Sequence, residues 1–294
     1  MVLDLKKARI ITAMTTPFDE EGSIDYGRLE KLINFLLENG TEGLVVGGTT
    51  GESPTLTHDE KLDLYRKTVE LVARRVPIIA GTGSFNTAET IAFTKEVETL
   101  AGIDAALVVT PYYSKPNQAG LYAHFEAVAK STRLPIIIYN VPGRTSVSID
   151  PKTTIKLSSI ENIIGVKECL GLDALSEEIE QTPDDFLVYT GEDGNAFPAK
   201  CIGATGVISV ASHVLGNEMS EMYNLLQEGS MAEAAQIHRQ LVPKMNSLFT
   251  VPSPAPVKFA LNHLGINVGS LRLPLVPCTK AEENHVLTEL NWTK

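Results

Sequence analysis

Eight short runs of apolar residues recur along the first two thirds of the chain. Each run holds four to six residues, is rich in β-branched side chains, and is nearly continuous rather than alternating with polar positions. Strands of a parallel sheet, which are buried on both faces, show this pattern. The predicted strands are residues 11–14, 43–48, 77–81, 105–110, 135–140, 163–168, 186–191 and 206–210.

Amphipathic segments separate these runs and predict helices. Leucine and isoleucine recur on one face of residues 26–37. A second helix is predicted over residues 59–73, where Thr57 is a candidate N-cap and Glu60 follows three residues later, as in a capping box. Thr87 is expected to open a third helix.

Strands and helices alternate at intervals of about 20 to 34 residues, which favours repeated βα units. Eight such units predict an α/β fold of the closed (β/α)8, or TIM, barrel type, with an open doubly wound sheet as the alternative. After the eighth run, helical patterns follow without strands, over residues 219–227, 231–247 and 256–264. We therefore expect a barrel over residues 1–225 and a C-terminal helical region over residues 226–294.

The composition argues against several classes of protein. Of 294 residues, 43% are hydrophobic, which is enough to bury a core and argues against intrinsic disorder. The 36 acidic side chains outnumber the 25 basic ones, for a net charge of -11, so no nucleic-acid partner is expected. No run approaches the roughly 20 apolar residues of a membrane span, so no membrane partner is expected either.

Two further features favour a cytoplasmic location. The N-terminal residues lack the apolar core of a secretory signal. The three cysteines, Cys169, Cys201 and Cys278, are widely spaced and form no C-x-x-C pair, which argues against a disulfide framework and a zinc site.

The functional side chains of a (β/α)8 barrel lie at the carboxyl ends of its strands. Five of the predicted strands end in segments with polar or glycine-rich character, at residues 47–53, 110–116, 139–145, 166–168 and 190–193. We therefore expect a functional site at this rim.

Lys167 is the first candidate for chemistry. Two-residue alternation places Ile163, Gly165 and Lys167 on one face of their strand, and that face is the better candidate for the barrel interior. Desolvation there disfavours an ammonium, so a neutral amine becomes available to attack a carbonyl. The same alternation puts Tyr139 near the end of its own strand, where a phenol could relay protons. From the residues alone, a solvated strand-end lysine and a core tyrosine remain the alternatives.

Two other segments suit the binding of a carboxylate. Glycines in the segment 47–53 let the backbone approach an anion closely, and Thr49 and Thr50 add hydroxyls, although a plain tight turn is the alternative. Arg144 follows Tyr139 in a Pro-Gly-Arg-Thr turn, where its guanidinium suits a bidentate carboxylate unless it is an ordinary exposed loop residue. The six histidines show no metal-ligand spacing, and G-x-S-x-G is absent.

Taken together, five motifs closely resemble those of the dihydrodipicolinate synthase family, over about residues 8 to 275; in chain order they are GGTTGES, TPYYSKP, YNVPGRT, GVKE and GVISV. That family belongs to the pyruvate-dependent class I aldolases, which include N-acetylneuraminate lyase. The resemblance implies a lyase that condenses pyruvate with L-aspartate 4-semialdehyde in the diaminopimelate branch of lysine biosynthesis, with no metal or organic cofactor. It also implies a homotetramer formed as a dimer of dimers.

The same resemblance implies roles for the residues that carry out the reaction. Lys167 forms an imine with the keto carbon of pyruvate, and the methyl group then becomes an enamine nucleophile. Tyr139, Thr49 and Tyr113 match a proton-relay triad, in which Tyr113 is supplied across a tight dimer interface.

It also implies the residues that bind the substrates. Thr49 and Thr50 hold the pyruvate carboxylate, and Arg144 matches the residue that binds the carboxylate of aspartate semialdehyde. Gly191 and Ile208 match backbone positions that line the pocket. Arg144 and the paired threonines favour the synthases over the neuraminate lyases. A sibling lyase of N-acetylneuraminate or 2-keto-3-deoxy sugar acids is the alternative, followed by a catalytically silent barrel.

One departure from the family concerns feedback inhibition by lysine. In lysine-inhibited members, the allosteric pocket includes positions that match Ser53, Pro54, His58, Lys61, Phe85, Glu89 and Tyr112. A cation at Lys61 should repel the ammonium groups of lysine, and Phe85 removes an amide partner. We therefore predict weak or absent inhibition by lysine.

Overall fold

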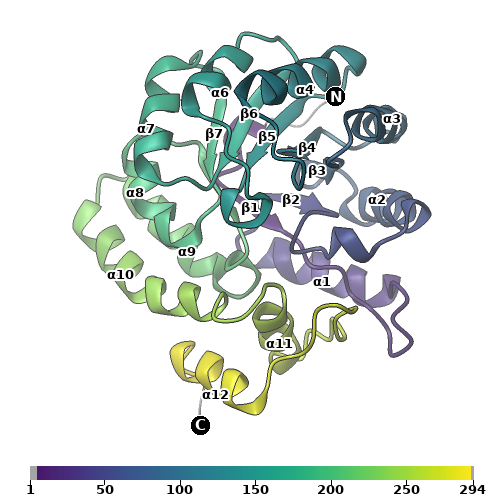
Figure 1. The fold of residues 1–294 in the computed structure, drawn as a ribbon. Coiled ribbons are helices and arrows are strands. Elements are labelled where there is room, and N and C mark those ends of the chain that lie inside the picture. The colour runs from purple at the N-terminus through teal and green to yellow at the C-terminus, as the bar shows by residue number, and fades with distance from the viewer. Residues whose placement is uncertain (1–4, 293–294) are drawn as a thin grey trace. The chain divides into compact units, whose positions relative to one another are not determined.

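The computed structural model describes residues 5–292; residues 1–4 and 293–294, at the outer ends of the two predicted domains, lie outside the described residues. Eight parallel strands follow one another around a closed barrel in chain order (Figure 1). They are β1 Ile10–Ala13, β2 Gly43–Val46, β3 Ile78–Gly81, β4 Ala105–Val109, β5 Ile136–Asn140, β6 Ile163–Glu168, β7 Leu187–Thr190 and β8 Gly206–Ser209. The predicted barrel is confirmed, and the open sheet was the wrong alternative.

All eight predicted runs form strands, and burial is the reason. Every residue of β1, β2, β5, β7 and β8 is buried. A strand that is covered on both faces needs apolar residues at successive positions, and this requirement produced the continuous runs in the sequence.

The chain divides into two compact units, which are described separately. The first contains residues 76–208 and the segment that ends at Arg9. Its strands β3 to β8 are joined by helices, which are η1 Leu5–Lys7, α3 Thr87–Glu98, α4 Gln118–Ser131, α5 Pro142–Thr145, α6 Pro151–Leu157, α7 Leu172–Gln181, η3 Asp193–Asn195 and α8 Ala196–Cys201. In the parallel register of this unit, Tyr139 on β5 lies opposite Lys167 on β6, and Lys167 lies opposite Tyr189 on β7.

The second unit contains residues 10–75 and the described residues from 209 onward. Besides β1 and β2 it holds η2 Ser53–Thr55 and the helices α1 Tyr26–Glu38, α2 His58–Val72, α9 Ser212–Gln227, α10 Met231–Ser247, α11 Ala255–His263 and α12 Lys280–Glu289. The predicted capping box opens α2: the Glu60 N–H donates to the Thr57 hydroxyl, and the Thr57 N–H donates to the Glu60 carboxylate.

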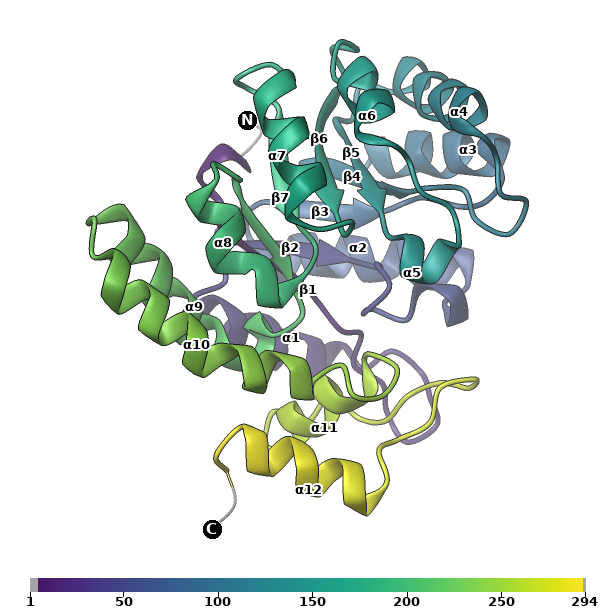
Figure 2. The same ribbon diagram turned by 60° about the vertical axis from the view of Figure 1, so that its left-hand side comes forward.

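The C-terminal helices differ in two places from the pattern that predicted them. Helix α9 begins earlier than predicted, because the chain kinks at Leu215 (φ -124°, ψ 16°), which interrupts the helical periodicity. Helix α12 was not predicted, because its sequence has no apolar stripe; the buried residue of this helix is Val286. Helix α10 packs against α9 and α12, and α11 packs against α12 (Figure 2). The boundary expected after residue 225 stays a prediction. No helix within residues 5–292 has the length and apolar character to cross a membrane.

Candidate active site

Lys167 and Tyr139 form the centre of the candidate site in the first unit. They are register partners on neighbouring strands, and each is 6% exposed. The Lys167 amine lies over the face of the Tyr139 ring, with Nζ 4.3 Å from the ring centroid. A primary amine and a phenol are thus placed where both can act on one small carbonyl compound.

Gly191 leaves the space that the Lys167 side chain occupies. It follows β7, and its N–H donates to the Glu168 carbonyl oxygen at 2.8 Å. A Cβ at this position would lie 2.9 Å from Lys167 Cε and 2.3 Å from Cys169 Sγ. Both distances are shorter than van der Waals contact, so any side chain at Gly191 would push against the amine-bearing chain.

Glu192, directly after Gly191, is a carboxylate whose pKa is affected by the charge of Lys167. Partial desolvation raises the pKa of Glu192, while a hydrogen bond from the Cys169 thiol and the positive charges of Lys167 and Arg144 lower it. Burial raises the pKa of Cys169 to about 12, so the thiol keeps the proton that it donates. Two cations, Lys167 on β6 and Arg144 on α5, therefore act on the same carboxylate.

Glu168, the residue after Lys167 on β6, belongs to a buried pair of carboxyl groups. Glu168 and Glu178, which comes from α7, are both 0% exposed. The Asn140 amide donates to both oxygens of Glu168, at 3.0 and 2.9 Å, and the Leu170 N–H donates at 2.7 Å. Burial, and then repulsion from Glu168, raises the pKa of Glu178, so the pair retains a proton. Because Asn140 and Glu168 are register partners, their bond ties the two strands together beside the reactive pair.

The other predicted residues of this unit differ in exposure. Tyr113 is 91% exposed in the loop after β4, with a φ of +67°. Arg144 is exposed on the short helix α5, whereas Ile208 is completely buried on β8. The structure therefore brings Lys167 and Tyr139 together, and it leaves the Tyr113 phenol facing solvent.

Thr49 and Thr50 lie in a turn after β2, in the second unit. Thr50 is buried and Thr49 is half-buried. The turn begins at Gly47, whose φ of +63° favours glycine, and a Cβ there would lie 2.4 Å from the Tyr65 hydroxyl oxygen. The glycine is thus required both by its backbone conformation and by the close approach of a side chain.

Three residues near this site were not predicted from the sequence: Cys169, Glu178 and Glu192. Glu192 could have been found, because it belongs to the strand-end segment 190–193. Glu178 could not, because a glutamate within a helix is ordinarily a solvated surface residue.

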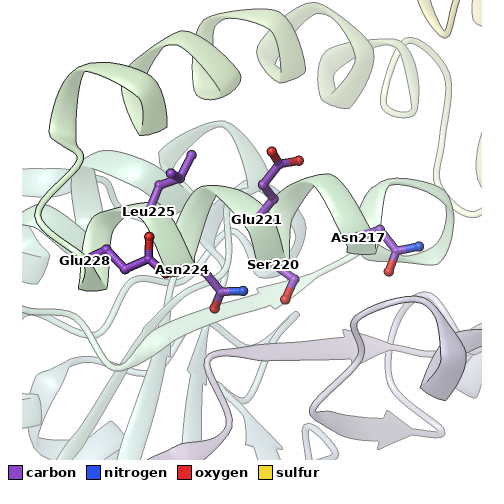
Figure 3. Close-up of a pocket in the computed structure, with 6 residues that line it drawn as sticks. All are labelled: Asn217, Ser220, Glu221, Asn224, Leu225 and Glu228. Carbon is purple, nitrogen blue, oxygen red and sulfur yellow. The ribbon is translucent and has the colours of Figure 1, made fainter.

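A shallow hollow of about 470 Å³ lies along α9 and contains none of the predicted site residues (Figure 3). It is lined by Asn217, Ser220, Glu221, Asn224, Leu225 and Glu228. Within residues 5–292, no group of three or more His, Cys, Asp or Glu side chains is arranged to hold a metal ion.

Comparison with known proteins agrees with the fold and the motifs. The model of the Dihydrodipicolinate synthetase family matches residues 6–292. The chain is 58% identical, over 288 residues, to the 4-hydroxy-tetrahydrodipicolinate synthase of Enterococcus faecalis, with 98% of this chain and 99% of that protein covered. The crystal structure of dihydrodipicolinate synthase from Bacillus anthracis matches with a TM-score of 0.96 and 50% identity over 100% of both chains. A structure of the enzyme from Cyanidioschyzon merolae with lysine bound matches with a TM-score of 0.94 and 39% identity, over 98% of this chain and 99% of that one.

Proposed function

The chain belongs to the dihydrodipicolinate synthetase family, and we propose that it condenses pyruvate with L-aspartate 4-semialdehyde through an imine on Lys167. It is a lyase of the class I aldolase type, and its product, 4-hydroxy-tetrahydrodipicolinate, feeds the diaminopimelate route to lysine. The observation that carries the mechanism is the buried Lys167 amine over the ring of Tyr139 on the next strand. The proposed reaction uses no metal and no organic cofactor.

The reaction begins with attack of the Lys167 amine on the keto carbon of pyruvate. Loss of one water leaves an imine, which withdraws electrons so that the methyl group gives up a proton and becomes an enamine. The enamine carbon forms a bond to the aldehyde carbon, and the resulting alkoxide takes a proton. The amino group of the former semialdehyde then attacks the imine carbon, which closes the ring and releases the lysine amine.

Tyr139 moves protons during these steps. Its ring lies against the Lys167 side chain, and both are nearly excluded from water. A phenol in this position can give a proton to the hydroxyl group that leaves as water, recover one from the methyl group, and give that proton to the alkoxide. Thr49 and Tyr113 complete the relay.

Groups at the strand ends bind the two substrates. Thr49 and Thr50 hold the pyruvate carboxylate through the turn after β2, and Arg144 holds the carboxylate of aspartate semialdehyde. The backbone of Gly191 and Ile208 lines the pocket. The net charge of -11 opposes the approach of two carboxylates, so affinity comes from these local groups rather than from the field of the whole chain.

Tyr113 points to an assembly of several copies. An aromatic side chain that is 91% exposed on a loop with positive φ is suited to pack into a neighbouring subunit. We propose that Tyr113 completes the relay of a second copy across a tight dimer interface, within a homotetramer built as a dimer of dimers in the cytoplasm.

Borohydride reduction in the presence of pyruvate tests the imine directly. The reduced adduct is expected on Lys167 after digestion and peptide mass spectrometry, and Lys167→Arg should abolish it. The exposed Lys130, which pairs with Glu126 on a helix surface, is the internal control and should gain no adduct. If Lys167 carries no adduct, the mechanism is wrong.

A second assay separates the proposed substrate from those of the sibling lyases. The enzyme is supplied with pyruvate and either L-aspartate 4-semialdehyde or N-acetylmannosamine. Turnover is expected with the semialdehyde. Turnover with N-acetylmannosamine in its place would support the sibling activity.

A further inference from the structure

A completely buried ion pair joins the turn after β2 to the C-terminal helices of the second unit. Nζ of Lys258, on α11, lies 2.6 Å from Oε1 of Glu52, and the two side chains are 1% and 0% exposed. The Lys258 ammonium also donates to the Ser270 carbonyl oxygen at 2.7 Å and lies 4.2 Å from the centroid of the Phe18 ring. Burial lowers the pKa of Lys258 to about 8, and the charge of Glu52 opposes that fall. A buried charge of this kind needs its partner, because an unpaired one is strongly destabilising.

The second carboxylate oxygen of Glu52 is bound by the segment that follows α11. The backbone N–H of Arg272 donates to Glu52 Oε2 at 3.0 Å. The Arg272 guanidinium is itself held by Glu60 of α2 and by the Thr55 carbonyl oxygen, each at 2.9 Å from Nη1. Residues from the C-terminal part of the chain therefore bind both oxygens of Glu52.

The backbone of Glu52 closes the Thr49–Thr50 turn. Its N–H donates to the Thr49 carbonyl oxygen at 3.1 Å, and its φ of +56° lies in the left-handed region, which is unfavourable for a residue with a Cβ. The preceding carbonyl oxygen, of Gly51, accepts a bond from the Thr16 hydroxyl at 2.7 Å. The side-chain anchors of Glu52 compensate for this backbone conformation, so the geometry of the turn depends on them.

We propose that Glu52 and Lys258 are positioning residues for pyruvate, because their buried ion pair holds the Thr49–Thr50 turn in the geometry that receives the substrate carboxylate. This inference rests on the proposed function, which assigns that turn to pyruvate. It gives the C-terminal helices a part in substrate binding, although Lys258 acts only through Glu52 and does not touch the substrate.

Lys258→Met tests the inference, because it keeps an unbranched side chain only one atom shorter and leaves the Glu52 carboxylate buried without its partner. The KM for pyruvate is expected to rise about tenfold or more and kcat to fall, because Thr49 also belongs to the proton relay, while the KM for aspartate semialdehyde changes by less than about twofold. Lys280→Met is the matched control: Lys280 also lies 2.6 Å from its partner, Glu283, but it is 90% exposed, so wild-type constants are expected.

Two further variants keep the test decisive if Lys258→Met does not fold. Glu52→Gln breaks the same pair from the other side and keeps an acceptor for the Arg272 N–H. The double variant Glu52→Gln/Lys258→Met leaves no lone buried charge, so its thermal midpoint should exceed that of Lys258→Met while its pyruvate KM stays raised. A wild-type pyruvate KM in any folded variant of the pair overturns the inference.

Borohydride labelling separates this result from a failure of the proposed function. A wild-type enzyme that gains no pyruvate adduct on Lys167 refutes the proposed function itself. A wild-type enzyme that does label, together with variants of the pair that reach half-maximal labelling at the same pyruvate concentration, refutes the positioning role alone.

Discussion

A substitution at Gly191 can displace the Lys167 amine while every proposed reacting group keeps its chemistry. In Gly191→Ala, the new methyl group would lie 2.9 Å from Lys167 Cε and 2.3 Å from Cys169 Sγ. Carbon atoms pack favourably at about 3.5–4.0 Å, so Lys167 Cε has to recede by about 0.6–1.1 Å. The backbone of Gly191 is bonded to the Glu168 carbonyl oxygen, which limits how far the loop can move instead.

The expected loss follows from that displacement. Moving a reacting group by about 1 Å lowers the rate by about 100-fold, which corresponds to about 2.7 kcal/mol of activation free energy. Overpacking of this kind lowers the free energy of unfolding by about 1–3 kcal/mol, which a protein of ordinary stability withstands. We therefore expect a folded variant in which the imine forms about 100-fold more slowly than in the wild type.

The assay is the rate at which borohydride traps the pyruvate adduct on Lys167 at saturating pyruvate, read by mass spectrometry beside a thermal unfolding curve. Gly143→Ala is the matched control, because a Cβ at that position would meet no atom within 4 Å beyond its chain neighbours and its own helix backbone. The steric reasoning is refuted if Gly191→Ala forms the imine at the wild-type rate, or if Gly143→Ala loses as much.

Two other predictions concern pH and lysine. Burial raises the pKa of Glu178 above 4.5, so the folded chain keeps a proton that the unfolded chain releases and stability falls as pH rises above that value. Glu178→Gln should remove this fall. The unfolding free energy of the variant, relative to that of the wild type, should therefore rise by up to about 1.4 kcal/mol per pH unit as pH rises. An equal difference in unfolding free energy at pH 5 and at pH 8 contradicts the prediction. Lysine should inhibit steady-state turnover weakly or not at all, because Lys61 repels its ammonium groups and the Phe85 ring packs edge-on against Tyr112, with ring centroids 5.3 Å apart. Inhibition at sub-millimolar lysine contradicts this prediction.

Local patterns in the sequence were sufficient to predict the barrel and the strands that carry Lys167 and Tyr139. Each apolar run became a strand, because residues covered on both faces must be apolar in succession. The capping box at Thr57 formed because all its groups lie within one turn of helix. Two-residue alternation put Lys167 and Tyr139 at matching places on adjacent strands, and the parallel register then made them neighbours.

The tertiary structure alone decided which charged groups are buried. Glu52 and Lys258 lie about two hundred residues apart, and each is typical of a solvated surface until the other is brought against it. Glu178 is buried together with Glu168, which comes from a different element, and burial raises the pKa of Glu178 so that it keeps a proton. The sequence by itself determined which segments become buried strands, because a run of apolar residues is a local property of the chain. A buried charge is stable only beside a partner, and the fold brings that partner from a distant segment.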